Sequence, residues 1–376
     1  MDSFSRAAVA PPCNLASIKP AASLDERSRA DQPPSRGTTV HKSKKGLLIA
    51  AALTILPAGL ATAAPYDAPQ TGLPDEVQSH IDQAYLILKG DVSVRNLPGF
   101  LYLVDEKAFP PPVPASRKYP QPTAAKAFDQ FYYLGDNWVN AWALNTRDGI
   151  IVFDTLTSPE EASQFIEGGL RKVGLDPKNI KYVVITHGHP DHLGGAKYLQ
   201  EKYHAKVAMS AADWDIVQKN PTPPVPVPAR DISITDGQKL TLGGATLSFY
   251  LTPGHTPGTV STIFPVTDHG RPHVVSFVGG TGLPNVKDPS KGPTKTLRES
   301  LTRFAKVSLD AGADVVISSH PFNDDAYEKA KLITDGKAKT ASPFVSTPEA
   351  VLRYYTSMVE AVYALEAFDR MKLSKP

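Results

Sequence analysis

The chain has 376 residues, 41% of them hydrophobic and 21% charged, which is the composition of a globular protein with one large domain or two ordinary ones. The formal net charge is +2, and the excess of positive charge lies in residues 1–45, which hold eight Lys or Arg against four Asp or Glu. The rest of the chain is nearly neutral. This excludes the basic surface that nucleic-acid-binding proteins need, so we expect no nucleic acid partner.

The N-terminal region has the pattern of an export signal. The basic segment His41–Lys45 precedes the apolar run Leu47–Leu60, and the small residues Ala61–Ala63 follow as a cleavage site. We therefore predict that residues 40–63 are a signal peptide and that the protein is periplasmic or secreted. The alternative is a membrane anchor, but the run is shorter than the ~20 residues of a spanning helix, so we expect no stable membrane insertion after cleavage.

The segments on either side of this signal carry no recognisable chemistry. Residues 1–39 are polar and without periodicity, and we predict that they are disordered or an over-extended start. Residues 64–127 are predicted to form an extension and a proline-rich linker, with a helical pattern over residues 73–88 and the proline cluster Phe109–Pro114. We expect this extension to pack on the outside of the main domain.

The main domain is predicted over residues 128–376, where short apolar runs alternate with helical patterns in two similar halves. The segment Pro221–Pro228 cannot complete a strand ladder and is predicted to be a loop, which either borders the active site or is an inert connection. Two halves of strands followed by helices favour an α/β fold of four layers, an αβ/βα sandwich, with a C-terminal helix. Strands are predicted over residues 130–134, 138–145, 149–154, 181–185, 205–209, 239–242, 245–251, 260–266, 273–278 and 314–317, and helices over residues 158–173, 193–203, 211–219, 294–309 and 348–371.

One segment of the main domain carries a dense set of metal-binding residue types. The apolar strand Tyr182–Ile185 is followed by three imidazoles and a carboxylate within six positions, at His187, His189, Asp191 and His192. Neutral imidazole and carboxylate are ligands that zinc prefers, and so short a segment brings them together with little loss of chain entropy. The alternative is a histidine-rich polar turn that binds no metal.

Two further histidines follow strand-like runs in the second half. His255 lies after the run Leu247–Leu251, and His320 lies after Val315–Ile317. Because the carboxyl ends of successive strands meet at one edge of a sheet in α/β proteins, these side chains are expected to join the first cluster. Five histidines and one aspartate then make two sets of three ligands. The only cysteine, Cys13, lies upstream of the predicted cleavage site, so a thiolate ligand is excluded.

With these motifs the chain resembles the metallo-β-lactamase superfamily of metallohydrolases over residues 128–368, and it is most similar to the third subclass of class B β-lactamases. The main motif is His-x-His-x-Asp-His with its preceding strand and its following Gly-Gly helix. The supporting segments are Thr252–Gly258, the hairpin Val266–Arg271, His320-Pro321, and Pro343–Val345 ahead of a terminal helix. The resemblance implies a zinc metallohydrolase with the four-layer sandwich fold.

The resemblance also implies a role for each ligand. Each set of three would hold one zinc ion: His187, His189 and His255 the first, and Asp191, His192 and His320 the second. A hydroxide would bridge the two ions, because zinc lowers the pKa of bound water from ~15.7 toward ~7, and catalytic Asp191 would orient it. Asp154 resembles the family's strand-end aspartate and would orient a ligand histidine.

The chain departs from the family pattern after the strand 273–278. The lactamase subclass normally has a serine and a further hydroxyl residue there, which help to hold the β-lactam carboxylate, whereas glyoxalase-type thioesterases and lactonases have a metal-bridging aspartate. This chain has Gly280 and Gly282 instead. We predict that these two glycines and Trp138 line the substrate pocket, although an aromatic residue in a strand is more often part of a core.

We therefore predict an exported zinc-dependent hydrolase that cleaves an amide or ester bond in a small-molecule substrate by attack of a metal-bound hydroxide, with β-lactams as the first candidates. Two alternatives remain open. One is a related metallohydrolase acting on a lactone or another small ester, and the other is a non-catalytic zinc-dependent binding protein. Three protein ligands per metal leave an open coordination position, which favours an enzyme over a binding protein.

Overall fold

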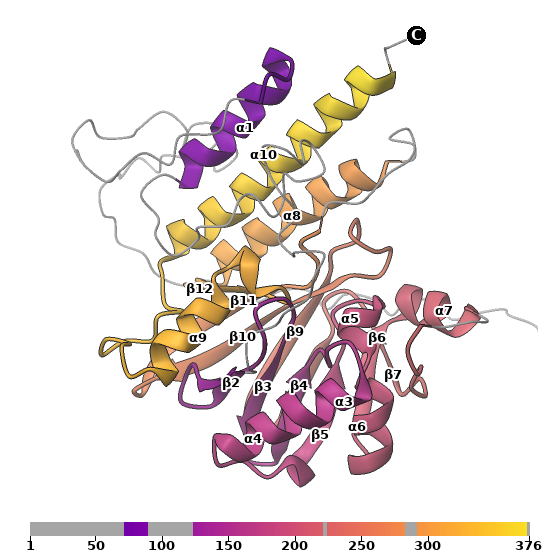
Figure 1. The fold of residues 1–376 in the computed structure, drawn as a ribbon, viewed down its shortest axis with the longest axis vertical. Helices are drawn as coiled ribbons and strands as arrows, with labels where there is room; N and C mark the ends of the chain where they lie inside the picture. Colours follow the sequence, from indigo (N-terminus) through magenta and orange to yellow (C-terminus); the bar gives the residue numbers. More distant parts are fainter. Residues whose placement is uncertain (1–70, 89–122, 221–223, 283–291, 374–376) are drawn as a thin grey trace, which may run out of the picture. The chain divides into compact units, whose positions relative to one another are not determined.

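The computed structural model describes residues 71–88, 123–220, 224–282 and 292–373 (Figure 1). All of them belong to one unit, Thr62–Pro376, which contains two β-sheets and the helices that cover them. The predicted signal peptide, the residues before it and the proline cluster of the linker lie outside the described residues. Among the helices in the described ranges, none is both long and apolar enough to cross a membrane.

The first sheet has seven strands in sequence order, from β1 to β7. Neighbouring strands are antiparallel from β1 to β4 and parallel from β4 to β7. In the parallel part, β4 is apolar along its whole length because both faces of the sheet are covered. The strands are β1 (Thr123–Lys126), β2 (Phe131–Gly135), β3 (Asn140–Thr146), β4 (Gly149–Phe153), β5 (Ile180–Val184), β6 (Lys206–Ser210) and β7 (Ile232–Ile234).

The second sheet has five strands in the order β12-β11-β10-β9-β8. Four of them form an antiparallel meander, and β12 pairs with β11 in parallel. The parallel pair needs a long crossover, which α8 supplies. The strands are β8 (Lys239–Leu242), β9 (Ala245–Leu251), β10 (Val260–Asp268), β11 (Arg271–Val278) and β12 (Val315–Ser318).

Helices cover the outer face of each sheet (Figure 1). Those of the first half pack on the first sheet, and α8 and α10 pack on the second. The four-layer αβ/βα sandwich predicted from the sequence, with its terminal helix, is therefore confirmed. The helices are α1 (Asp75–Leu88), α3 (Pro159–Glu161), a π-helical turn (Ala162–Glu167), α4 (Gly168–Lys172), α5 (Pro190–Leu193), α6 (Ala196–Tyr203), α7 (Ala211–Lys219), α8 (Pro293–Asp310), α9 (Ala326–Thr334) and α10 (Pro348–Leu373), with short 3-10 helices at Pro177–Asn179 and Pro321–Asn323.

Aromatic side chains fill the space between the two sheets. Phe131 stacks on Trp142 with ring centroids 4.8 Å apart, and Phe153 stacks on Phe264 at 5.3 Å, which joins the first sheet to the second. Along β3, Trp142 faces this core and the next residue, Ala143, faces the helices, as the two-residue period of a strand requires. The small side chain on the outer face lets the helices pack close to the sheet.

Within the predicted extension, residues 64–127, the structure describes α1 and β1, and α1 packs on α10. His80 of α1 lies with its Nδ1 2.7 Å from Glu360 Oε2, and its ring stacks on Tyr363. The helix therefore adds an outer layer to the second half of the molecule. Its buried residues are Val77, Ile81, Ala84 and Tyr85.

The structure adds elements that the sequence patterns did not predict. β1 begins the first sheet before the predicted start of the main domain at residue 128, and β7 closes its other edge. Both are short strands, and α9 is a short helix, so none carries a strong periodic signal. β3 begins at Asn140 and not at residue 138, because Asp136 Oδ1 accepts from the backbone N–H groups of Trp138 and Val139 and holds them in a turn.

Two of the predicted helices are interrupted where they meet each other. The helix predicted over residues 193–203 breaks between α5 and α6, because Gly194 and Gly195 lie against the segment around Thr157 and Ala162 with no room for a Cβ atom. The helix predicted over residues 158–173 contains the π-helical turn, which starts at Ala162. Because the two glycines allow this close contact, the segment that carries the histidines packs against the residues that follow β4.

Replacing Phe304 with alanine should lower the free energy of unfolding by about 3–5 kcal/mol, because its ring is 1% exposed between Tyr250 and Tyr355. Leu309 of the same helix is 44% exposed, and L309A should cost less than about 0.5 kcal/mol. Urea unfolding followed by circular dichroism measures both. Equal losses in the two variants would contradict the packing of α8.

Candidate metal centre

The sequence places the first cluster of histidines directly after β5. The loop from Thr186 to Pro190 follows the carboxyl end of this strand, and the second histidine loop follows β9 at the same end of the sandwich. Backbone pairing joins the two halves here, since Val260 N–H donates to Thr186 O at 2.8 Å. The edge where the two sheets meet therefore carries the candidate site.

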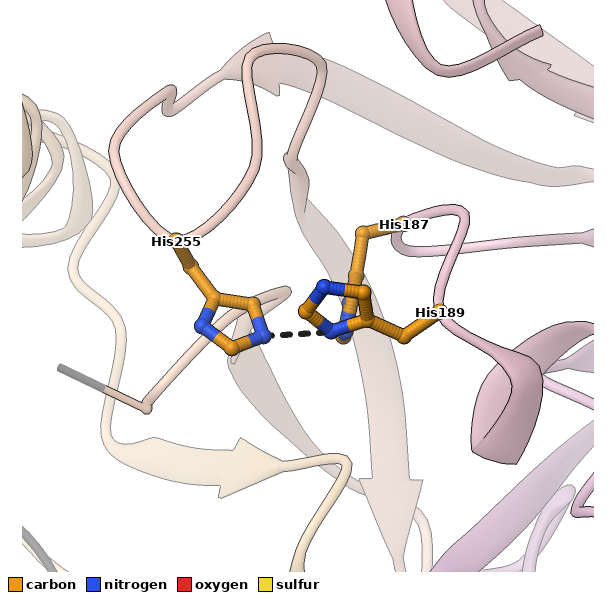
Figure 2. A group of neighbouring side chains, drawn as sticks. All are labelled: His187, His189 and His255. Atoms are coloured by element: carbon orange, nitrogen blue, oxygen red, sulfur yellow. Dashed lines mark hydrogen bonds between the residues drawn. The ribbon is translucent and has the colours of Figure 1, made fainter. Parts of the chain in front are cut away.

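The structure brings the first predicted set of three side chains together. The ligand atoms of His187, His189 and His255 all lie within 4.8 Å of one another. Their rings point toward a common centre, and Nε2 of His187 lies 3.1 Å from Nε2 of His255 (Figure 2). His187 is buried and His189 is exposed, so the group is open on one side.

The second predicted set also converges. The ligand atoms of Asp191, His192 and His320 lie within 4.8 Å of one another. Nε2 of His192 lies 3.2 Å from Nε2 of His320, and Asp191 Oδ2 lies 3.4 Å and 3.5 Å from these two nitrogens. The two groups are neighbours, because the rings of His187 and His192 lie 4.1 Å apart between centroids.

Four of the five histidine rings are held through Nδ1 by an oxygen that can only accept. The partners are Gly279 O for His187 (2.9 Å), Gly282 O for His255 (2.9 Å), Asp154 Oδ2 for His192 (2.9 Å) and Trp138 O for His320 (2.7 Å). Nδ1 must therefore carry the proton, which leaves the lone pair of each neutral ring on Nε2. Two lone pairs that face each other at 3.1–3.2 Å favour a cation between them, and the residues thus fit a metal ion in each group.

Burial and charge set the protonation of these groups. Burial lowers the pKa of His255 to about 3 and that of His320 to about 4, and it holds the pKa of His187 well below its usual value. Burial opposes ionisation of Asp191, but the neighbouring His192 outweighs it and lowers the pKa of this carboxyl group. Burial also opposes the charge on His192, yet the carboxylates of Asp191 and Asp154 raise its pKa to about 10. Without a metal ion His192 therefore carries a second proton on Nε2, and a metal ion bound there would displace that proton.

Asp154 lies where the sequence predicted an orienting aspartate. It is fully buried after β4 and accepts three hydrogen bonds: from Thr186 N–H and Thr186 Oγ1 at 2.8 Å each, and from His192 Nδ1 at 2.9 Å. Asp154 has φ 56° and Leu156 has φ 62°, in the left-handed region that a leucine rarely adopts. The backbone is thus strained at the segment after β4 that forms hydrogen bonds with the histidine loop.

The two predicted pocket glycines lie against one histidine. A Cβ atom at Gly280 would lie 2.8 Å from Cβ of His255, and one at Gly282 would lie 2.8 Å from its Cε1. The hydroxyl between them belongs to Thr281, which is 2% exposed and accepts from Asn323 Nδ2 at 2.5 Å. This strand end therefore forms a cradle for the His255 ring and offers no exposed hydroxyl.

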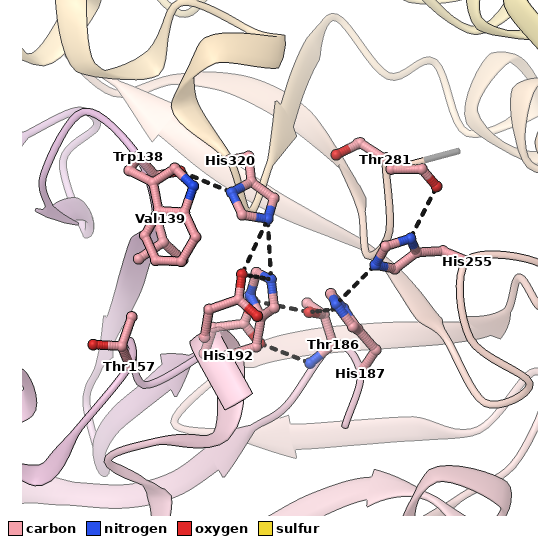
Figure 3. Close-up of polar contacts among 12 residues, drawn as sticks. Trp138, Val139, Thr157, Thr186, His187, His192, His255, Thr281 and His320 are labelled. Carbon is pink, nitrogen blue, oxygen red and sulfur yellow. Dashed lines mark hydrogen bonds and ion pairs between the residues drawn. The ribbon is translucent and has the colours of Figure 1, made fainter. Parts of the chain in front are cut away.

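Two aromatic rings lie beside His320. Trp138 lies 5.9 Å from it between centroids, and Phe322 stacks on it at 5.0 Å (Figure 3 shows Trp138). Both aromatic side chains are half-buried. Trp138 was predicted as a pocket residue, but Phe322 was not, although its place directly after His320-Pro321 was a usable signal.

The other described histidines lie apart from the two groups. His273 Nδ1 is 2.7 Å from Asp314 Oδ2, and His269 is exposed in the turn after β10. His204 has φ 57° and ends α6, a structural position as expected. None of these three belongs to a group of ligand atoms found among the described residues.

Comparisons with known proteins agree with this geometry. Residues 134–268 match the family model of the metallo-beta-lactamase superfamily. The fold is similar to a subclass B3 metallo-beta-lactamase of Bradyrhizobium japonicum (TM-score 0.56, 25% identity, 68% of this chain and 96% of that one). It is also similar to the native metallo-beta-lactamase of Legionella gormanii (TM-score 0.58, 23% identity, 69% and 100%), at an identity that speaks for the fold alone.

Curated relatives match over a shorter part of the chain. A hydroxyacylglutathione hydrolase of Acidiphilium cryptum is 32% identical over 131 residues, which are 35% of this chain and 46% of the relative. A probable polyketide biosynthesis zinc-dependent hydrolase of Bacillus velezensis is 32% identical over 106 residues, 28% of this chain and 43% of the relative. The chain thus spans less than half the length of these relatives.

Replacing Asp154 with asparagine should weaken zinc binding to the group of Asp191, His192 and His320 by about 10- to 100-fold. In the variant an amide N–H group would take the place of the carboxylate oxygen that accepts from His192 Nδ1. Two donors would then face each other, so the ring proton would have to move to Nε2, the nitrogen that is to bind zinc. Competition for zinc with a chromophoric chelator measures the affinity.

The matched control is Asp314→Asn, which removes the same kind of partner from His273 outside the site. D314N should bind zinc as the unaltered protein does. Equal zinc affinity in D154N and D314N would contradict the role of Asp154.

Proposed function

We propose, because residues 134–268 match the family model of the metallo-beta-lactamase superfamily, that the chain is an exported zinc-dependent hydrolase that cleaves an amide or ester bond in a small molecule. The observation that carries this proposal is the pair of adjoining three-ligand groups with their Nε2 lone pairs turned inward. We assign one zinc ion to His187, His189 and His255 and a second to Asp191, His192 and His320. The export signal over residues 40–63 remains part of the proposal on its sequence pattern.

The donor set favours catalysis over a purely structural metal. Three protein ligands leave a coordination position open, whereas structural zinc sites are closed by four. When bound, zinc lowers the pKa of a water molecule to about 7 and polarises a carbonyl oxygen. A non-catalytic binding protein has no need of that open position.

The side chains of the chain would orient the reaction. Asp191 supplies the single carboxylate of the six ligands, and its side chain is 22% exposed, so it can accept a proton or a hydrogen bond from the attacking water. Asp154 keeps the His192 ring in place through Nδ1. His189, the exposed ligand, lies on the side from which a substrate can approach.

β-Lactams are the first candidate substrates, and the likeness to subclass B3 metallo-beta-lactamases supports them. The likeness to hydroxyacylglutathione hydrolases supports a thioester or another small ester as the second candidate. Gly280 and Gly282 provide no hydroxyl for a β-lactam carboxylate, which we expect to reduce its turnover without removing the hydrolytic groups. Trp138 and Phe322, whose rings lie beside His320, are proposed to contact an apolar part of the substrate.

The zinc-loaded protein should hydrolyse at least one member of a panel of a penicillin, a cephalosporin, a lactone and a thioester. A chelator should reduce the rate to that without protein, and added zinc should restore it, because the ligand groups supply no nucleophile of their own. H189A should lose the activity, and H269A, which changes a histidine side chain that is 76% exposed outside the site, should keep it. Turnover of lactone or thioester without any β-lactam would overturn the first candidate, and no turnover with zinc bound would favour the binding protein.

W138A and F322A should each lower kcat/KM for an apolar substrate by about tenfold, since lost apolar contact in a pocket is worth roughly 1–3 kcal/mol. Zinc content should stay unchanged, because the backbone carbonyl of Trp138, which holds His320, remains in W138A. Y198A on α6 is the control for loss of a half-buried aromatic ring. Unchanged kcat/KM in both variants would contradict the proposed contact.

A further inference from the structure

One buried carboxylate joins the two loops that carry the first group of histidines. Asp213 in the first turn of α7 is 1% exposed, and its Oδ2 accepts from Gly188 N–H and from Thr256 Oγ1, each at 2.8 Å. Gly188 lies between His187 and His189, and Thr256 directly follows His255. A single oxygen atom therefore connects the backbone of one ligand loop to the side chain beside the other.

Both loops pack directly against α7. A Cβ atom at Gly188 would lie 2.9 Å from Val217 Cγ1, and one at Gly258 would lie 2.5 Å from Asp213 Oδ1. Side chains at these two positions would push the loops away from the helix. Gly188 and Gly258 are therefore needed for the two loops to pack this closely against α7.

Capping of α7 does not account for Asp213. Ser210 is the N-cap residue, and its Oγ accepts from Asp213 N–H at 3.2 Å. The carboxylate itself bonds to residues outside the helix. If the Asp213 side chain only stabilised the helix, its hydrogen bonds to Gly188 and Thr256 would not be needed.

The charge of Asp213 also has no basic partner. In the ranges that the structure describes, no lysine or arginine forms an ion pair with it. Its remaining partners are the hydrogen-bond donors of the two loops. Burial raises the pKa of Asp213, so a cation nearby would stabilise its charged form, and the three-histidine group is the adjoining site for one.

We propose that Asp213 is a positioning residue of this group: it fixes the spacing of the two loops, so that His187 and His255 face each other, and its charge favours a divalent cation there. The proposal rests on the proposed function in one respect: it takes His187, His189 and His255 as a metal site. It makes no assumption about the substrate.

The test compares D213N with D215N, the same change two positions along α7. Asp215 pairs with Arg230 on the surface, and its side chain is 52% exposed. Titration with Co²⁺, followed by its visible spectrum, reports each ligand group separately. D213N should weaken one of the two Co²⁺ affinities by about 10- to 100-fold and leave the other, and D215N should change neither.

A second pair of variants covers the case in which D213N does not fold. T256V removes one hydrogen bond to Asp213 and keeps its charge, and T256S restores the hydroxyl. T256V should weaken the same Co²⁺ site and alter its spectrum, and T256S should return both toward those of the unaltered protein.

Unaltered affinities and spectra in D213N, or identical behaviour of T256V and T256S, would overturn the proposal. Because metal binding is measured without substrate, this failure is distinct from failure of the proposed function. A protein that loses one Co²⁺ site in D213N but hydrolyses no panel member would refute the function and leave the role of Asp213 standing.

Discussion

The candidate site depends on hydrogen bonds that hold Nδ1 in four of its five imidazoles. Where Nδ1 donates to a carbonyl or carboxylate oxygen, the ring is fixed in orientation and its Nε2 lone pair is left to face the centre. His187 and His255 receive this support from Gly279 and Gly282, and His192 receives it from Asp154. Without these acceptors the rings could rotate or shift their protons, and the lone pairs would no longer converge.

The fold is what brings those acceptors to the histidines. Gly279 and Gly282 follow β11, Trp138 lies in the turn before β3, and Asp154 follows β4, so both sheets contribute at one edge. At each of these places the backbone must come close to a histidine ring. At His255 this is possible because Gly280 and Gly282, which lie against the ring, have no side chain. The left-handed conformation of Asp154 is part of the cost of this arrangement, and three hydrogen bonds to its carboxylate help to offset it.

The sequence predicted the fold, and it predicted that the six side chains of the candidate site lie close together, because strand patterns and strand ends can be read from short segments. His187 and His192 are separated by a few residues after a strand, and the strand-end rule extends to His255 and His320. The sequence could not predict contacts between distant segments: it showed that Gly280 lacks a hydroxyl, but not that it lies against the His255 ring. The link from Asp213 to Gly188 and Thr256 leaves no pattern in the chain, and short elements such as β1, β7 and α9 have too few residues for a clear period.

The most direct test of the account is an anomalous difference map, measured at the zinc absorption edge, from crystals of the zinc-loaded protein. The account predicts two peaks about 3.5–4 Å apart, one among the ligand nitrogens of His187, His189 and His255 and the other beside Asp191, His192 and His320. A map with no peak between the facing Nε2 atoms, or with zinc bound only elsewhere on the molecule, would contradict it.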